Sequence, residues 1–246
     1  VKEIYVDPLI KQYFDYVVGL FTFDLGTGAR SMVHALEADN FVTRSNDGRA
    51  DPWGGFWIGT MAYDFAPGRG ELFQLEVNSR RPRPVLAGLT ISNGIGWSPD
   101  SATMYLNDSG DGGTWAFDYD PIEGLSGRRR FALPDGDGLA DGLAVDAEGG
   151  VWTARYDGGR VNRYDASGRL DAVIEVPGVS KVTACCFGGD DLDTLFITTS
   201  RENLAEDDEP AADPEQSEQR VRVDHRRPSA EAANKTDDRL EANLHS

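Results

Sequence analysis

Residues 140–152 read ADGLAVDAEGGVW, and this stretch is the clearest copy of a pattern that recurs along the chain. It contains a polar residue, a glycine, a short apolar strand, a tight turn and the start of a second strand. The same pattern occurs twice upstream, as SNDGRADPWGGFW at residues 45–57 and as SNGIGWSPDSATMY at residues 92–105. Short strands that recur with a period of about 40 to 50 residues are typical of a β-propeller, in which each repeat forms one blade. The sequence therefore predicts an all-β fold of the β-propeller type.

The polar residues that open the three copies are Asn46, Asn93 and Asp141, which are 47 and 48 residues apart. A fourth, weaker copy has Thr183 at the same place, ahead of Gly188-Gly189. Rotation about one axis relates equivalent positions of successive blades, so we expect these four side chains to converge in a central channel. The alternative is that Asn-Gly and Asp-Gly are only turn dipeptides. Three copies in register favour the channel.

A second pattern of alternating apolar residues recurs later in each repeat, around Phe23, Leu75, Phe117 and Tyr164. Alternation of this kind is typical of a strand with one buried face. It predicts the outer strand of each blade.

The length and the charge limit the class of protein. A chain of 246 residues is long enough for a single all-β domain, and a net charge of −18 argues against nucleic-acid binding through a basic patch. No run of about 18 apolar residues occurs, so the sequence predicts no membrane span. The adjacent Cys185 and Cys186 suit small buried positions in a reducing compartment, and we expect a cytoplasmic protein.

A change of composition after residue 200 divides the chain. Residues 1–203 are predicted to form the propeller domain, in which residues 1–39 match the repeat least well. Residues 204–246 are acidic and polar, with too few apolar side chains to form a core. We therefore expect this tail to be disordered or loosely attached.

The residue types in the repeats exclude several kinds of chemistry. The three histidines, His34, His225 and His245, lie outside the repeats, so no Ser-His-Asp or Cys-His mechanism and no Cys/His zinc site is predicted. Neither a Gly-x-Ser-x-Gly elbow nor a Walker phosphate loop occurs. The predicted channel offers amide and carboxylate oxygens, which suit a hard divalent cation.

Two of these polar residues have alternative interpretations. Arg44 precedes Asn46 by two residues, so both side chains lie on one side of an extended strand. The planar guanidinium of Arg44 suits the oxygens of a polyol or an anion, and the alternative is a salt bridge between blades. For Asp141, the alternative to a cation ligand is an aspartate that caps its own turn.

These motifs resemble the SMP-30/gluconolactonase/regucalcin family. The matching segments occur in the family's order: RSNDG at 44–48, residues 51–61, ISNG at 91–94, residues 141–152, GGRV at 158–161, CCFGG at 185–189 and TTSR at 198–201. The resemblance implies a six-bladed propeller with one divalent cation (Ca, Zn, Mn or Mg) in the channel. The implied reaction is the opening of a small-molecule sugar lactone by metal-activated water.

The resemblance also implies roles for individual residues. Asn93 and Asp141 would bind the metal, and Asp141 would be the catalytic base. Arg44, Asn46 and Asp64 would bind the substrate; at the position of Asp64 the animal members have glutamate.

The sequence departs from the family pattern at the third protein ligand of the metal. That ligand is a glutamate in an N-terminal Gly-Glu-Gly-Pro motif, which this sequence lacks, and Glu3 does not fit the motif. A backbone carbonyl, a water or another carboxylate would have to replace it. The repeats also account for fewer than six complete blades. The alternatives to a lactonase are therefore a catalytically impaired cation-binding or scaffold propeller and another metal-dependent ester hydrolase on the same frame.

Overall fold

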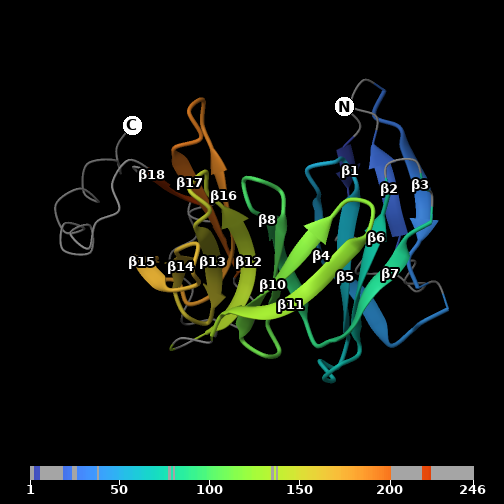
Figure 1. Ribbon diagram of the computed structural model, residues 1–246, viewed down its shortest axis with the longest axis horizontal. Helices are drawn as coiled ribbons and strands as arrows, with labels where there is room; N and C mark the ends of the chain where they lie inside the picture. The colour runs from blue at the N-terminus through green and yellow to red at the C-terminus, as the bar shows by residue number, and fades with distance from the viewer. Residues whose placement is uncertain are drawn as a thin grey trace.

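The computed structural model describes residues 3–5, 19–23, 27–37, 39–76, 79, 81–133, 136, 138–200 and 218–222. Over these residues the chain forms strands and turns without a helix, so the described part holds no helix that could cross a membrane. The strands build five antiparallel sheets, in each of which every strand pairs with the next one along the chain. Figure 1 shows these sheets arranged along the long axis of the molecule.

Three of the sheets are four-stranded blades. They are β4 (Thr43–Ala50), β5 (Phe56–Ala62), β6 (Gly70–Leu75) and β7 (Arg83–Leu89); β8 (Ser92–Trp97), β9 (Thr103–Asp108), β10 (Gly113–Asp120) and β11 (Gly124–Ala132); and β12 (Leu139–Val145), β13 (Val151–Tyr156), β14 (Arg160–Tyr164) and β15 (Leu170–Glu175). For brevity, the β4–β7 sheet is called blade A, the β8–β11 sheet blade B and the β12–β15 sheet blade C.

The other two sheets have three described strands each. They are β1 (Glu3–Tyr5), β2 (Gly19–Phe23) and β3 (Arg30–Ala35), and β16 (Val182–Gly188), β17 (Thr194–Thr199) and β18 (Glu218–Arg222). They lie at opposite ends of the long axis in Figure 1, and none of their described strands pairs across to the other sheet. The described residues therefore account for five sheets, and the six blades that the resemblance implies are not established.

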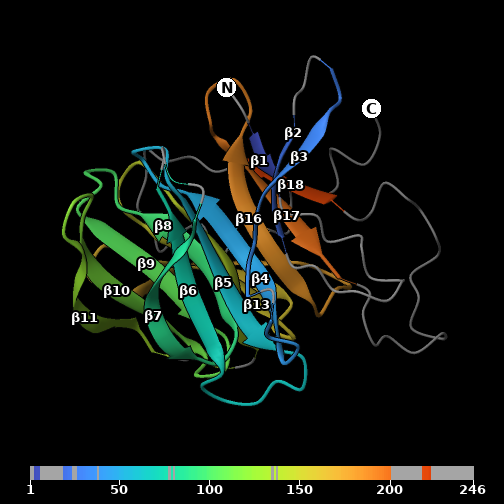
Figure 2. The same cartoon turned by 90° about the vertical axis from the view of Figure 1, so that its right-hand side faces the viewer.

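The first strands of the sheets form the centre of the arrangement. β4 contacts β8, β8 contacts β12, and β12 contacts β16. Figure 2 shows the twisted strands of the sheets around them. The four polar residues predicted to open the innermost strands, Asn46, Asn93, Asp141 and Thr183, lie on these four strands, one on each.

Strand β5 shows how the blades pack. All of its residues are buried because sheets cover both of its faces. Trp57 belongs to the core between blades A and B, where its ring meets those of Trp97 and Tyr119 at centroid distances of 6.0 and 5.9 Å. Its neighbours Phe56 and Ile58 point the other way, into a separate core. Hydrophobic burial on both faces therefore holds each blade between its neighbours.

The repeated turn after the first strand is held by an aspartate. Asp51 accepts hydrogen bonds from the backbone N–H groups of Trp53 and Gly55 and, through Oδ2, from Nε1 of Trp57 at 2.9 Å. Asp146 accepts from the equivalent groups in blade C, including Nε1 of Trp152 at 2.8 Å. The two repeats therefore share a sequence pattern because each uses a buried aspartate that binds both the turn and a tryptophan of the next strand.

The predicted outer strands are third strands, and in this respect the prediction is wrong. The residues Leu75, Phe117 and Tyr164 lie on β6, β10 and β14, and each blade continues with a fourth strand. The sequence analysis did not identify the fourth strands, because apolar and polar residues do not alternate along them. In β11 the residues from Ser126 to Arg130 are all exposed.

Two smaller expectations also need correction. Cys185 is buried but Cys186 is exposed, because neighbouring residues of a strand face opposite sides, and both thiols are free. Glu218–Arg222 lies inside the predicted tail, yet it forms β18 and pairs with β17. Backbone pairing adds a strand there without the apolar content that the sequence analysis required; the rest of residues 204–246 lies outside the described residues.

Candidate active site

Each of the four inner strands carries a register irregularity at its predicted polar residue. The pairing shifts between Ser45 and Gly48 in β4, between Ser92 and Ile95 in β8, between Ala140 and Leu143 in β12, and between Val182 and Ala184 in β16. A β-bulge of this kind places an extra residue in one strand and turns its side chain away from the regular pleat. The repeated motif is therefore a repeated bulge that sets the direction of the polar side chains.

Hydrogen bonds join the polar residues of blades A and B. Asn46 donates through Nδ2 to Oδ1 of Asn93 at 2.8 Å and to the backbone oxygen of Ser92 at 3.0 Å. Arg44 donates through a terminal guanidinium nitrogen to Oδ1 of Asn46 at 3.0 Å. The predicted side-by-side placement of Arg44 and Asn46 is confirmed, and Arg44 forms no salt bridge with a described residue. Arg44, Asn46 and Asn93 thus form one chain of contacts.

Two residues that the sequence analysis missed connect blades B and C. Ser109 is buried; it accepts a hydrogen bond from Nδ2 of Asn93 at 2.7 Å and donates to the backbone oxygen of Ala140 at 2.5 Å. Asn107 is also buried and donates to the backbone oxygen of Asp141 at 2.6 Å. In the sequence they are marked only by a cluster of polar residues at the end of β9. The backbone oxygens to which they donate lie in blade C.

Burial and a neighbouring charge both act on Asp141. Burial, the larger cause, and the negative charge of Asp47 together raise the pKa of this carboxyl to about 7, against a smaller lowering by the Gly142 N–H. Burial also raises the pKa of Asp47, although the Gly48 N–H and the charge of Arg49 oppose this. The channel therefore holds two carboxylates close enough to influence each other, and the sequence analysis assigned no role to Asp47.

A cavity of about 280 Å³ lies beside these carboxylates. Asp47, Gly48 and Arg49 of β4 line it together with residues of β8, β12 and β16, namely Ile95, Gly142, Leu143, Ala184, Cys185 and Cys186. Residues from four sheets therefore meet at one space, as expected for the channel of a propeller.

Thr183 and Asp64 lie apart from this network. Thr183 shares a hydrogen bond of 2.9 Å with Thr198 of its own sheet and makes no hydrogen bond with the asparagines or Asp141. Asp64 is exposed in the turn after β5, where its carboxylate accepts from the backbone N–H of Ala66 at 3.1 Å. Asp64 is near the Arg44 end of β4, because Arg44 pairs with Met61 in the sheet.

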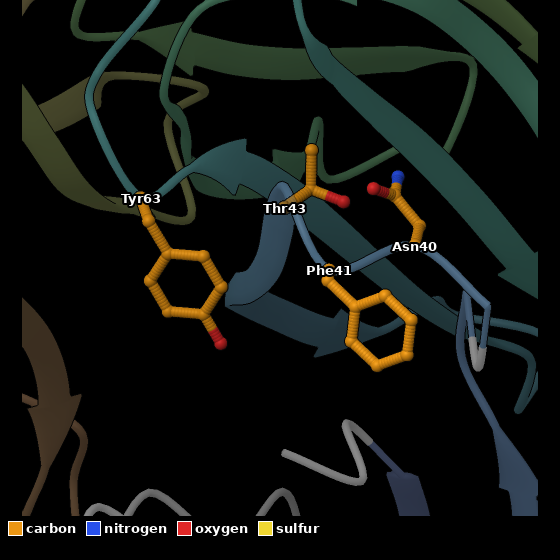
Figure 3. Close-up of a pocket in the computed structure, with 4 residues that line it drawn as sticks. All are labelled: Asn40, Phe41, Thr43 and Tyr63. Atoms are coloured by element: carbon orange, nitrogen blue, oxygen red, sulfur yellow. The ribbon is translucent and has the colours of Figure 1, made fainter. Parts of the chain in front are cut away.

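A second pocket, of about 290 Å³, lies at this end of β4. Asn40, Phe41, Thr43 and Tyr63 line it, and Figure 3 shows the rings of Phe41 and Tyr63 on either side of open space. Phe41 is 82% exposed, which is unusual for a phenylalanine. Two exposed aromatic side chains therefore line a pocket next to Arg44 in the sequence.

Comparison with known proteins identifies the family. A family model described as "SMP-30/Gluconolactonase/LRE-like region" matches residues 14–201. The chain belongs to this family. Regucalcin from Xenopus laevis is 37% identical over 180 residues, which is 70% of this chain and 60% of that protein. A protein from Sulfolobus acidocaldarius is 38% identical over 176 residues, 70% of this chain and 63% of the relative. The chain thus spans about three fifths of the length of these curated relatives.

Solved structures support the family's fold. A regucalcin from Agrobacterium tumefaciens, described as a calcium-binding protein, has a TM-score of 0.71 and 36% identity over 77% of this chain and 64% of its own. A luciferin-regenerating enzyme has the same TM-score with 26% identity, over 90% of this chain and 77% of its own. A gluconolactonase from Xanthomonas campestris has a TM-score of 0.63 at 23% identity, over 74% of this chain and 62% of its own, and shows the fold alone.

The inner strands carry oxygen donors that are relevant to a cation site. No group of three or more His, Cys, Asp or Glu side chains in the described part of the chain is placed to hold a metal. The inner strands β4, β12 and β8 instead carry the carboxylates of Asp47 and Asp141 and the amide oxygen of Asn93, which keeps a second lone pair beside its bond from Asn46. Oxygen donors of this kind suit a hard divalent cation such as Ca²⁺.

Proposed function

We propose that this chain is a divalent-metal-dependent hydrolase that opens sugar lactones. Membership of the SMP-30/gluconolactonase/LRE-like family supports the reaction class. The observation that carries the proposal is the contact between blades at the channel, where Asn46 bonds Asn93 and a hydroxyl links Asn93 to the backbone next to Asp141. These contacts link the inner parts of three blades, and they support a site shared among them.

Asn93 and Asp141 would hold the cation in this proposal. Their oxygens come from adjacent inner strands, and Ser109 and Asn107 fix the backbone and the amide that carry them. The bound cation would supply Lewis-acid polarisation of the lactone carbonyl. The chain supplies the rest of the chemistry.

Asp141 serves as the general base. A carboxylate beside the attacking water can accept its proton. In the reaction Asp141 takes a proton from the water that attacks the lactone carbonyl, the ring C–O bond breaks, and the ring oxygen receives a proton to give the hydroxy acid. Burial keeps competing water away from this carboxylate.

Arg44, Asn46 and Asp64 would orient the substrate. Arg44 already holds Asn46 in place, and its remaining N–H groups can donate to ring hydroxyls. Asp64 is exposed at the same end of β4 and can accept from a hydroxyl. Such positioning lowers the barrier by fixing the carbonyl in front of the attacking water.

The test is hydrolysis of a panel of aldonolactones by the full chain, with Ca²⁺, Zn²⁺, Mn²⁺, Mg²⁺ or a chelator. We expect metal-dependent turnover that Asp141→Ala abolishes and Asp191→Asn, an exposed carboxylate in the β16–β17 turn, leaves intact. Turnover that persists in chelator, or an Asp141→Ala variant as active as the unmodified chain, contradicts the proposal.

A catalytically impaired, cation-binding propeller is the second candidate. It is favoured by the small number of acidic ligands, since the described residues hold no group of three. It predicts cation binding by calorimetry without turnover of any lactone. A panel of aryl esters in the same assay separates a third possibility, another ester hydrolase, which the aromatic rings of Phe41 and Tyr63 would suit.

A further inference from the structure

Two aromatic side chains line the pocket beside the start of β4. Figure 3 shows the rings of Phe41 and Tyr63 on either side of its open space, and the other described residues that line it are Asn40 and Thr43. Phe41 is 82% exposed and Tyr63 is 37% exposed, so both are accessible. The cavity of about 290 Å³ lies at the lower end of the roughly 300–1,000 Å³ that is typical of small-molecule sites. It therefore suits a small ligand.

Hydrogen bonds fix the segment that presents Phe41. The backbone N–H of Val42 donates to Oδ1 of Asn40 at 3.0 Å, and the backbone oxygen of Val42 accepts from the N–H of Tyr63 at 3.0 Å. The peptide units on both sides of Val42 are therefore tied, one to the loop and one to the chain after β5. A large apolar side chain that is held in the solvent loses the burial that such side chains usually gain, and beside a pocket this favours a role in binding.

A carboxylate lies behind the polar wall of the pocket. Glu37 accepts from Nδ2 of Asn40 through one oxygen and from the hydroxyl of Thr43 through the other, each at 2.8 Å. Glu37 is half-buried, and no Lys, Arg or His in the described part of the chain forms an ion pair with it. Its φ of 51° lies in the left-handed region, which residues other than glycine rarely adopt. The two bonds hold this conformation, so a negative charge stays next to two residues of the pocket.

The pocket lacks a cation of its own among the described residues. The hydroxyl hydrogen of Thr43 is used in its bond to Glu37, so this oxygen offers only lone pairs to a ligand. Arg44 follows Thr43 in a regularly paired part of β4, so its side chain faces the opposite way, where it donates to Asn46. The faces of aromatic rings attract positive charge, and so does a carboxylate. The surroundings of the pocket therefore complement a cation.

We propose that this pocket binds a small organic ammonium ion, with its alkyl groups against Phe41 and Tyr63 and with Glu37 as the counter-charge behind Asn40 and Thr43. Aromatic side chains recognise quaternary ammonium groups in this way, whereas a metal ion needs several direct oxygen ligands. The ligand is a free small molecule, because the cavity is small. This site is separate from the proposed hydrolytic centre, and the inference does not depend on lactone hydrolysis.

The experiment is NMR titration of the full chain with choline chloride, with sodium chloride at the same ionic strength as the blank. We expect saturable binding of choline and about tenfold weaker binding of dimethylbutanol, its neutral carbon isostere. Phe41→Leu keeps an apolar side chain at an exposed position, so it should fold, and it should weaken choline binding by about tenfold. Phe65→Leu is the matched control. It removes another exposed ring, which is not among the described residues of the pocket, and it should bind like the unmodified chain.

Glu37→Gln separates charge from packing. The variant keeps the size of the side chain and loses its charge, so choline should bind more weakly and with less dependence on salt, while binding of dimethylbutanol should not change. The inference fails if choline does not saturate, if dimethylbutanol binds as tightly as choline, or if Phe41→Leu or Glu37→Gln binds choline normally. A trimethyl-lysine peptide that binds more tightly than choline would assign the pocket to a protein segment and overturn the small-molecule ligand. None of these outcomes changes the result expected in the lactone assay.

Discussion

Asn46 donates its side-chain amide to the side-chain carbonyl of Asn93 over 2.8 Å, although 47 residues and a blade boundary separate them. Asn46 is held in turn by Arg44, which donates to its amide oxygen. The direction of the Asn93 oxygen is therefore set from blade A. Asn46, which is proposed to contact the substrate, therefore also positions Asn93, which is proposed to bind the cation.

The first prediction concerns Asn46→Ala. The variant loses the donor to Asn93, so the amide of Asn93 is free to rotate, and cation affinity should fall by about tenfold. The Michaelis constant for a lactone should rise as well, because Arg44 loses its anchor. Calorimetric titration with Ca²⁺ and steady-state kinetics measure the two effects. Thr183→Ala, at the equivalent bulge but outside the network, is the control; equal losses in both variants would contradict the argument.

The second prediction concerns Ser109→Ala. Ser109 is 4% exposed, and its hydroxyl bonds both Asn93 and the backbone oxygen of Ala140. Its removal takes one hydrogen-bond partner from each of these groups, at a cost of about 1–3 kcal/mol in the free energy of unfolding. The additional stability gained on adding Ca²⁺ should also shrink.

Urea unfolding with and without Ca²⁺ measures both quantities. Ser98→Ala is the matched control, because the Ser98 hydroxyl ties only its own turn, through Asp100 and Thr103. That variant should lose stability without losing the Ca²⁺ effect. A Ser109→Ala variant that gains as much from Ca²⁺ as the unmodified chain would show that the hydroxyl has a structural role alone.

Much of this network follows from the sequence, and the reason is periodicity. The spacing of Asn46, Asn93 and Asp141 predicts that rotation brings them to one axis, and the strand period places Arg44 beside Asn46. Both predictions depend only on regular geometry. The chemical roles of these residues stay predictions.

The residues that were missed depend on contacts between blades. Ser109 and Asn107 sit at a strand end where polar residues are common, and only the next blade shows what they bond. Asp47 was missed for another reason. It lies in the bulge of β4, where side chains do not follow the regular alternation of a strand.

The third prediction concerns acid stability and Asp146. Burial alone would raise the pKa of this carboxyl, but hydrogen bonds from Arg163, Trp152 and Gly150 outweigh burial and lower it below its usual value. Because the folded pKa is depressed, the stabilisation is complete above the unfolded value of about 3.9 and is lost as the pH falls through the folded value. We expect the free energy of unfolding to decrease below about pH 4.

Urea unfolding from pH 7 to pH 3 tests this in the unmodified chain and in Asp146→Asn. The variant should be less stable at pH 7 by about 2–4 kcal/mol, because it weakens a hydrogen-bonded ion pair with the partly buried Arg163. Its stability should depend less on pH below pH 4. Parallel curves for the two proteins would assign the acid sensitivity to other carboxyls.

The fourth prediction concerns the hydroxyl that ties blade B to the turn of blade A. Tyr119 donates to Oδ2 of Asp51 at 3.0 Å, across 68 residues of sequence, and burial and this bond raise the pKa of the phenol. Tyr119→Phe removes a bond to a carboxylate and should cost about 1.5–3 kcal/mol in the free energy of unfolding. Asp51 keeps three N–H donors, so its charge remains satisfied and the fold should persist.

Tyr105→Phe is the matched control for that prediction. Tyr105 is also buried, on the opposite side of blade B, and its hydroxyl forms no hydrogen bond with a described residue. Loss of a hydroxyl that bonds no described residue should leave stability nearly unchanged. Urea unfolding of both variants at pH 7 gives the comparison. If Tyr105→Phe costs as much as Tyr119→Phe, the two blades are held together by ring packing, and the contact between Tyr119 and Asp51 adds nothing.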